Sequence, residues 1–291
     1  MTKLNMGKYR EKIYRSFISG TYNSTMECGY EPSMIYFDYY KLELDKIMNI
    51  ADKLENDTTI KFLSCHCCMI SNKGAVYLFQ KLKNNNTLET LILHGNKLEE
   101  TAFISLCEML ENNNSIKMLC TSSIKIKPGV INCIAKMLTI NNKIETLDMG
   151  KMKIKVSELK ILCEALTHNK SLKHLYLYEN NFGENNHKDC EHLLNLIDSN
   201  KNIKTLSIHS CNIVSTGINS ILSAMINNKN ITELILSYNE INGNNVDKLC
   251  ELIRKNNTLE KLELSKNMFS DDDTKVILNT LKDNSLLQIV L

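Results

Sequence analysis

Apolar residues along most of this chain follow two alternating spacings. In residues 87–114, the first part has apolar positions at Leu88, Leu91, Leu93 and Leu98. The second part places apolar residues three and four positions apart, between Phe103 and Leu110. Alternation over two residues is typical of a strand, and a spacing of three and four is typical of a helix. The segment therefore predicts one strand followed by one helix.

The same pattern recurs with a nearly constant period. Seven segments are 28 residues long, and one is longer by three residues: 59–86, 87–114, 115–142, 143–170, 171–201 (the longer one), 202–229, 230–257 and 258–285. Because one strand and one helix cannot bury their apolar sides alone, such units stack on one another. The expected fold class is α/β: a right-handed β-α solenoid, or horseshoe, with a parallel inner sheet and outer helices.

Each unit begins with the motif L-x-x-L-x-L-x-x-N-x-L, as in LETLILHGNKL, and ends in an Asn-rich turn. This motif resembles leucine-rich repeats of the ribonuclease-inhibitor subtype. The junctions LCEMLENNNSIKML and LCELIRKNNTLEKL are also similar to those of Ran GTPase-activating proteins and tropomodulin. The resemblance covers residues 59–291 and implies a horseshoe that binds another protein.

The repeats define the expected organisation of the chain. Residues 59–285 form eight leucine-rich repeats of about 28 residues, and residues 33–58 read as a helical N-terminal cap. Residues 286–291 match a truncated C-terminal capping strand, and residues 1–32 are an unassigned N-terminal extension.

The Asn of the motif is expected to hydrogen-bond backbone groups in the turn after each strand. Cys68 and Cys211 occupy this position in two repeats, where cysteine is a common substitute in the family. Ile124 and Met152 cannot replace the amide, so water is expected to satisfy the backbone there.

The solvent-facing strand positions form three columns across the sheet, on the side expected to be concave. His174, Tyr176 and Tyr178 lie on one strand, and Asp148 and His209 occupy flanking strands. Tyrosines bury a large area at low entropic cost and are frequent in binding hot spots. We therefore expect these five residues to bind a partner protein, with Phe62 and Met118 as weaker candidates. The alternative is that two tyrosines occur here by chance.

Composition narrows the range of partners and cellular locations that we expect for this chain. The net charge is +2 and no basic stripe follows the columns, so neither nucleic acid nor a membrane is an expected partner. No run reaches the roughly 18–20 apolar residues of a membrane span, and the charged N-terminus does not resemble a signal peptide. A cytoplasmic or nuclear location is expected, with the eleven cysteines reduced. The many Asn, Lys and Ile residues are attributed to an AT-rich genome.

Candidate chemistry is sparse. Cys65, His66, Cys67 and Cys68 lie near His94 in the repeat register, but strand alternation points Cys65 into the core, and Cys68 fills the Asn position of the motif. A metal site would therefore have only His66, His94 and Cys67 as ligands. Ordinary repeat positions are the preferred interpretation, so no metal and no cofactor are expected. Cys120 has no histidine beside it in register, and no catalytic motif is present. The chain is therefore not expected to be an enzyme.

The expected function is a non-enzymatic protein–protein interaction scaffold that binds a partner on its concave face. The alternative is a GTPase-activating or other regulatory protein of the Ran type, although the acidic tail of that family is missing. A tropomodulin-like capping role and a role as a pathogen effector also stay open.

Overall fold

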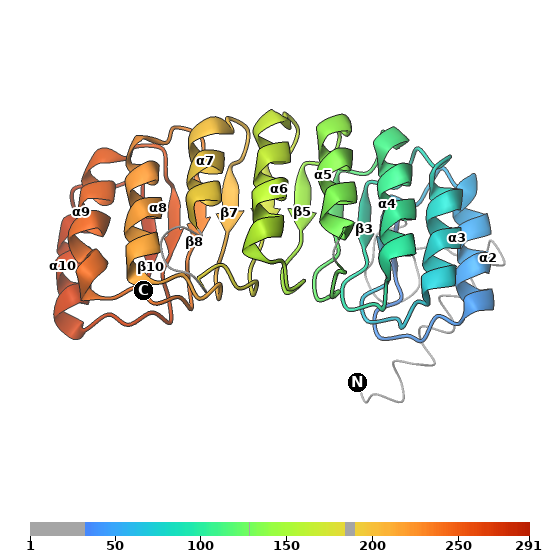
Figure 1. Cartoon of the computed structure of the whole chain (residues 1–291), viewed down its shortest axis with the longest axis horizontal. Coiled ribbons are helices and arrows are strands. Elements are labelled where there is room, and N and C mark those ends of the chain that lie inside the picture. The colour runs from blue at the N-terminus through green and yellow to red at the C-terminus, as the bar shows by residue number, and fades with distance from the viewer. Residues whose placement is uncertain (1–32, 128, 184–189) are drawn as a thin grey trace. The chain divides into compact units, whose positions relative to one another are not determined.

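The computed structural model describes residues 33–127, 129–183 and 190–291. The expected N-terminal extension, residues 1–32, lies outside these ranges. The chain divides into two compact units, Met1–Asp148 and Met149–Leu291. Strands and helices alternate along the chain in both of them (Figure 1).

The first unit is built from strands that pair in parallel with the next strand in sequence. The strands are β1 (Met34–Tyr36), β2 (Phe62–Ser64), β3 (Thr90–Ile92), β4 (Met118–Cys120) and β5 (Thr146–Asp148). The helices are α2 (Leu44–Glu55), α3 (Asn72–Leu82), α4 (Glu100–Asn112) and α5 (Val130–Ile140). Residues paired between β2 and β5 are 28 positions apart from strand to strand, which confirms the predicted period.

The second unit repeats this arrangement, and its strands also pair in parallel and in sequence order. The strands are β6 (His174–Tyr176), β7 (Thr205–Ser207), β8 (Glu233–Ile235), β9 (Lys261–Glu263) and β10 (Gln288–Val290). The helices are α6 (Val156–His168), α7 (Glu191–Ser199), α8 (Ser215–Asn227), the 3₁₀ helix η2 (Gly243–Asn245), α9 (Val246–Lys255) and α10 (Asp271–Leu281). His174 pairs with Thr205 at an offset of 31 residues, so the three extra residues lie between β6 and β7.

The two ends of the described chain both carry strands. Residues 33–58, expected as a helical cap, contain α2 and also β1, which pairs with β2. Strand β1 lacks the leucine motif, but Ile35 and Phe37 are fully buried and fill the same inner positions. At the other end, β10 pairs with β9, so residues 286–291 do contain a strand.

The core lies between the sheet and the helices of each unit. The central residue of each strand points inward, and leucines at this position from Leu63 to Leu262 are almost completely buried. Helices contribute the facing residues, such as Leu106 and Leu110 of α4. Burying one such side chain stabilises the fold by about 1.5–3 kcal/mol. The predicted strand and helix periodicities therefore correspond, within each unit, to the two sides of its core.

A buried asparagine occupies the turn that leads from most of the described helices into the next strand, whereas Asp57 holds this place after α2. Asn113 donates from Nδ2 to the carbonyls of Leu82 and Asn85 in the preceding repeat, at 3.3 and 2.9 Å. Its Oδ1 accepts from the backbone N–H groups of Ser115 and Ile116, both at 2.9 Å. The equivalent residues with this role are Asn85, Asn141, Asn200, Asn228 and Asn256. These asparagines form a ladder that joins consecutive repeats within each unit.

A second ladder lies in the turn after each strand, at the Asn of the repeat motif. Asn239 donates to the carbonyls of Ile208 and Leu236, at 3.1 and 3.0 Å, and accepts from the N–H of Ile213. In two repeats the thiols of Cys68 and Cys211 donate instead, each to a carbonyl of the preceding repeat at 3.4 Å. The substitution of cysteine for asparagine thus preserves the contact between repeats.

The turn at Met152 differs from the expectation that water would replace the missing asparagine. The N–H groups of Met152 and Ile154 donate to Oδ1 of Asn180, at 3.2 and 2.9 Å. Asn180 also donates to the carbonyl of Met149. The asparagine of one repeat serves the turn of the preceding repeat, so the backbone at Met152 is satisfied by protein.

The residue that follows each third-column position adopts a left-handed backbone conformation. These residues are Tyr39, Cys67, Gly95, Ser123, Lys151, Glu179, Ser210, Tyr238 and Lys266, with φ between 51° and 70°. The N–H groups of all of these residues except Ser123 and Lys266 donate to a carbonyl of the next repeat, as from Cys67 to His94 at 2.8 Å. The sheet pairing therefore continues past the strands, and the left-handed turn then directs the chain toward the helix.

Polar groups in the interior are well matched. Among the described residues, no buried side-chain nitrogen or oxygen lacks a hydrogen-bond partner. Within the same ranges, no helix has the length and apolar character needed to cross a bilayer.

Candidate protein-binding surface

The open face of each sheet, meaning the side turned away from the helices, presents the three predicted columns. In the second unit, strand pairing makes the members of each column neighbours on adjacent strands. The first column is His174, Thr205, Glu233 and Lys261, and the second is Tyr176, Ser207, Ile235 and Glu263. The third column follows two residues later in each repeat and contains Tyr178, His209, Ser237 and Ser265. The strand pairing thus confirms the register read from the sequence.

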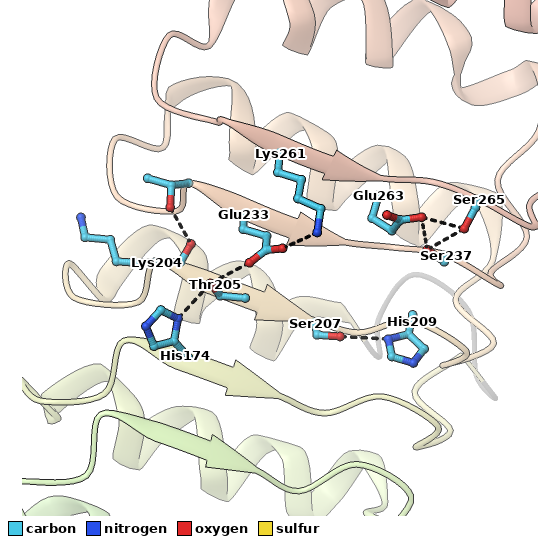
Figure 2. A network of polar contacts seen from close by, with 11 residues as sticks. His174, Lys204, Thr205, Ser207, His209, Glu233, Ser237, Lys261, Glu263 and Ser265 are labelled. Carbon is cyan, nitrogen blue, oxygen red and sulfur yellow. Dashed lines mark hydrogen bonds and ion pairs between the residues drawn. The ribbon is translucent and has the colours of Figure 1, made fainter. Parts of the chain in front are cut away.

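A continuous row of polar contacts crosses the first column (Figure 2). Nδ1 of His174 lies 2.9 Å from Oγ1 of Thr205, which donates to Glu233 at 3.2 Å. Because the threonine hydroxyl has one proton, it accepts from Nδ1–H of His174 while it donates to the carboxylate. Glu233 also pairs with Nζ of Lys261 at 2.8 Å, and this ammonium lowers the pKa of the carboxyl group. Four strands are therefore cross-linked by their side chains on the open face.

An aromatic pair lies in the third column. The Tyr178 ring stacks on the His209 ring, with centroids 4.7 Å apart and planes 4° from parallel. Nδ1 of His209 lies 2.9 Å from the hydroxyl of buried Ser207, which orients the imidazole (Figure 2). On its other side, the Tyr178 ring fills the space that a Cβ at Gly150 would occupy. Tyr178 is therefore held between Gly150 and His209 in one position.

The predicted binding residues fall in both units. His174, Tyr176, Tyr178 and His209 are half-buried on the open face of the second unit. Asp148 is the last residue of β5 in the first unit, where its Oδ2 accepts from Cys120 and Ser122, both at 3.2 Å. The other four predicted residues make up the candidate site in the second unit.

The weaker candidates, Phe62 and Met118, lie in the first column of the first unit, half-buried. Tyr36 of β1 packs against Phe62 with ring centroids 4.8 Å apart. Sequence reasoning missed Tyr36 because residues 33–58 were expected to form only a helical cap. The apolar residues Ile35 and Phe37, two positions apart, are the sequence signal that identifies this strand.

Residues with nucleophilic chemistry also meet on the first unit. Nδ1 of His94 lies 2.6 Å from Oγ of Ser122, which donates to Asp148. In a catalytic triad the carboxylate would orient the histidine, whereas here it accepts from the serine. Ser122 is fully buried, so it is closed to a substrate. This cluster therefore has the residues of a triad without its arrangement.

Cys120 is also unsuited to nucleophilic chemistry. Its side chain is 6% exposed, and burial together with the charge of Asp148 raises the pKa of its thiol to about 12. Three cysteines on helices α4, α6 and α9 are buried as well: Cys107, Cys163 and Cys250. Burial raises the pKa of Cys163 to about 12, as expected for a cysteine that packs as a small apolar residue.

Two exposed tyrosines lie just outside the predicted columns. Tyr39 and Tyr238 occupy the left-handed turn position, and their exposed fractions are 67% and 57%. Tyr238 is two strands from Tyr178 in the register, which corresponds to about 10 Å. The three predicted columns end one residue before this position and therefore do not include it. Its constant place one residue later in the repeat would have identified it.

Comparison with solved structures identifies proteins with a similar fold. No family model and no curated protein matches this sequence. A solved structure of an internalin, InlF from Listeria monocytogenes, is similar over 89% of this chain and 67% of its own, with 17% identity and a TM-score of 0.52. Internalin C2 from the same species aligns at 22% identity with a TM-score of 0.48, over 82% of this chain and 84% of its own. The actin-binding site 2 of leiomodin-1 aligns at 18% identity with a TM-score of 0.42, over 53% of this chain and 84% of its own.

The likeness to InlF extends over most of the chain, and in both units the strands pair in parallel and their central leucines are buried. Such a likeness at 17% identity bears on the fold alone, and it does not distinguish the ribonuclease-inhibitor subtype. The chain has the leucine-rich-repeat fold, an α/β solenoid in which strands and helices alternate.

Proposed function

We propose that this chain is a non-enzymatic scaffold that binds a partner protein on the open face of its second unit, the face expected to be concave. One observation carries the proposal: Tyr178 stacks on His209 and is seated over Gly150, on the surface of a sheet. His174 and Tyr176 of β6 precede Tyr178 in the sequence, and we call these three residues together with His209 the aromatic ridge.

The fixed geometry of the aromatic ridge lowers the entropic cost of binding a partner. Tyrosine is frequent in interface hot spots because it brings a large contact area with few rotatable bonds. Ordering a mobile side chain at an interface costs about 0.5–1.5 kcal/mol. Contacts on both faces of its ring already hold Tyr178 in place. A partner therefore meets a surface that is ordered before it binds.

The charges of this face favour a protein over a nucleic acid. Lys261 is paired with Glu233, and Glu263 accepts from Ser265 at 2.7 Å. Binding to a phosphate backbone requires lysines and arginines whose charge is not already neutralised. The face combines aromatic rings with hydrogen-bonding groups, which matches the mixed surface of a protein partner.

The experiment compares three forms of the full chain: wild type, the double variant Tyr176→Ala plus Tyr178→Ala, and Tyr77→Ala. Tyr77 is a control because it lies on helix α3, where its hydroxyl donates to Asp52 of α2. Proteins captured from the native cell by the wild type are purified and titrated against each form. We expect the double variant to bind at least tenfold more weakly, a loss of about 1.4 kcal/mol, and Tyr77→Ala to bind like the wild type.

Equal affinities for all three forms would remove this face from the proposal. A second measurement distinguishes the scaffold from the alternative, a GTPase activator. If the captured protein is a GTPase, its rate of GTP hydrolysis is measured with and without the chain. An accelerated rate supports a Ran-type activator, whereas unchanged hydrolysis with tight binding supports the scaffold.

A further inference from the structure

Three side chains of metal-binding type meet on the open face of the first unit. His66 and His94 occupy adjacent positions in the third column, and Cys67 lies in the turn after His66. One ligand atom from each residue lies within 4.8 Å of the other two. All three side chains are half-buried, so each contacts both the protein and the solvent.

The repeat geometry explains why the thiol joins the two imidazoles. The backbone at Cys67 is left-handed, with φ of 52°, so the inward–outward alternation of the strand ends there. The Cys67 side chain then lies against the next repeat, where a Cβ at Gly95 would be 2.5 Å from Sγ. Gly95 occupies the equivalent left-handed turn and leaves the space that the thiol fills.

The histidines are oriented by neighbouring groups. The His66 and His94 rings meet edge to face with centroids 4.4 Å apart, and the ring of Tyr39 lies 4.7 Å from that of His66. Ser122 donates to Asp148, so it accepts from Nδ1–H of His94 at 2.6 Å. The lone pair of the neutral His94 ring is then on Nε2. A hydrogen bond to the second ring nitrogen is the usual support of a metal-binding histidine.

We propose that His66, Cys67 and His94 form a binding site for a divalent transition metal ion, with Zn²⁺ as the best match. Two imidazoles and one thiolate suit zinc and exclude magnesium and calcium, which prefer oxygen ligands. This proposal is independent of the proposed function, because the site lies in the other unit. A water molecule or a side chain from another protein would complete a tetrahedron on the open face.

The distances require a small adjustment. Zinc lies about 2.0–2.1 Å from nitrogen and about 2.3 Å from sulfur, so tetrahedral ligands are separated by roughly 3.3–3.6 Å. The three ligand atoms, spaced at up to 4.8 Å, need to approach by about 1 Å. Rotation about the terminal torsions of the histidines, which have broad minima, permits this without backbone movement.

The sequence alone favoured ordinary repeat positions because strand alternation appeared to leave three ligands at best. The structure shows that these three do come together, since the left-handed turn brings Cys67 to the two histidines. Cys65 and Cys68 stay apart from the site because both are buried in the core.

The test uses the full chain without a histidine tag, reduced with a phosphine and freed of metal by a chelator. Co²⁺ is titrated first, because a cobalt–thiolate bond gives a charge-transfer band, and Zn²⁺ is then used to displace it. The wild type is expected to saturate at one equivalent of either ion. Cys67→Ser should lose the charge-transfer band, and both Cys67→Ser and His94→Ala should bind Zn²⁺ at least tenfold more weakly.

Cys133→Ser is the matched control, since Cys133 is a half-buried cysteine on helix α5 of the same unit and lies outside the cluster. It should bind like the wild type. The urea unfolding midpoint of each metal-free variant shows that the comparison is made between folded proteins. A wild type that does not saturate at one equivalent, or a folded Cys67→Ser variant that retains the band, would overturn the proposal.

Discussion

At the scale of single residues, the arrangement on each open face depends on a glycine beside a larger side chain. Gly150 leaves room for the Tyr178 ring, and Gly95 leaves room for the thiol of Cys67. Neither relation follows from the residue types alone, because each partner lies 28 residues away in the sequence. A missing side chain thus positions a side chain of a neighbouring repeat.

Gly150→Ala tests this relation directly. The new methyl group would overlap the Tyr178 ring, so the ring must move by roughly 1 Å to reach a normal carbon–carbon contact. We expect the ring to leave its stacked position on His209 and the affinity for the partner protein to fall toward that of Tyr178→Ala. The measurement is the NMR shift of the His209 ring protons, with Tyr178→Ala as the unstacked reference. A wild-type His209 shift in Gly150→Ala would contradict the expectation.

At the scale of the elements, asparagines hold each strand and helix to the adjacent repeat. Asn113 binds two carbonyls of the preceding repeat and two N–H groups of its own turn. It is 3% exposed, so these backbone groups would have little access to water if the amide were removed. The register of short strands is therefore supported by side chains at both of their ends.

Asn113→Ala is expected to lower the free energy of unfolding by about 2–4 kcal/mol, because buried backbone groups lose their partners. Asn114→Ala is the control, since Asn114 is exposed and donates only to the carbonyl of nearby Asn112. It should change the free energy of unfolding by less than about 0.5 kcal/mol. Urea unfolding followed by circular dichroism measures both variants, and similar losses for the two would disprove the role of the buried ladder.

At the scale of the whole molecule, the fold is a series of nearly identical contacts between consecutive repeats. In such arrays the stability is close to a sum of repeat terms and nearest-neighbour terms. The two units, Met1–Asp148 and Met149–Leu291, contain the same ladders and the same inward leucines. Substitutions in different units should therefore act independently.

A double-mutant cycle with Asn113→Ala and Asn228→Ala tests this independence. Asn228 makes the equivalent bonds in the second unit, to the carbonyl of Ile197 and from the N–H groups of Asn230 and Ile231, so the two asparagines share no partner. The losses of unfolding free energy should add to within about 0.5 kcal/mol. A coupling above about 1 kcal/mol, measured by urea unfolding of both single variants and the double variant, would show longer-range cooperativity.

The sequence by itself determined the repeat, its register and the columns of the open face. The reason is physical: strand alternation and a 28-residue period are one-dimensional, so counting places Tyr176 beside Ser207 as the sheet does. Counting also identified the leucines that fill the core.

The tertiary structure alone decided three further matters. The asparagines of the helix-to-strand turns, which composition alone attributes to an AT-rich genome, are buried and joined to the preceding repeat. Counting left His66, Cys67 and His94 as possible ligands, and the left-handed backbone at Cys67 decides that their ligand atoms meet. Tyr178 is held by Gly150 on one side and His209 on the other. Each of these depends on backbone angles and on contacts between repeats, which the order of residue types along the chain does not contain.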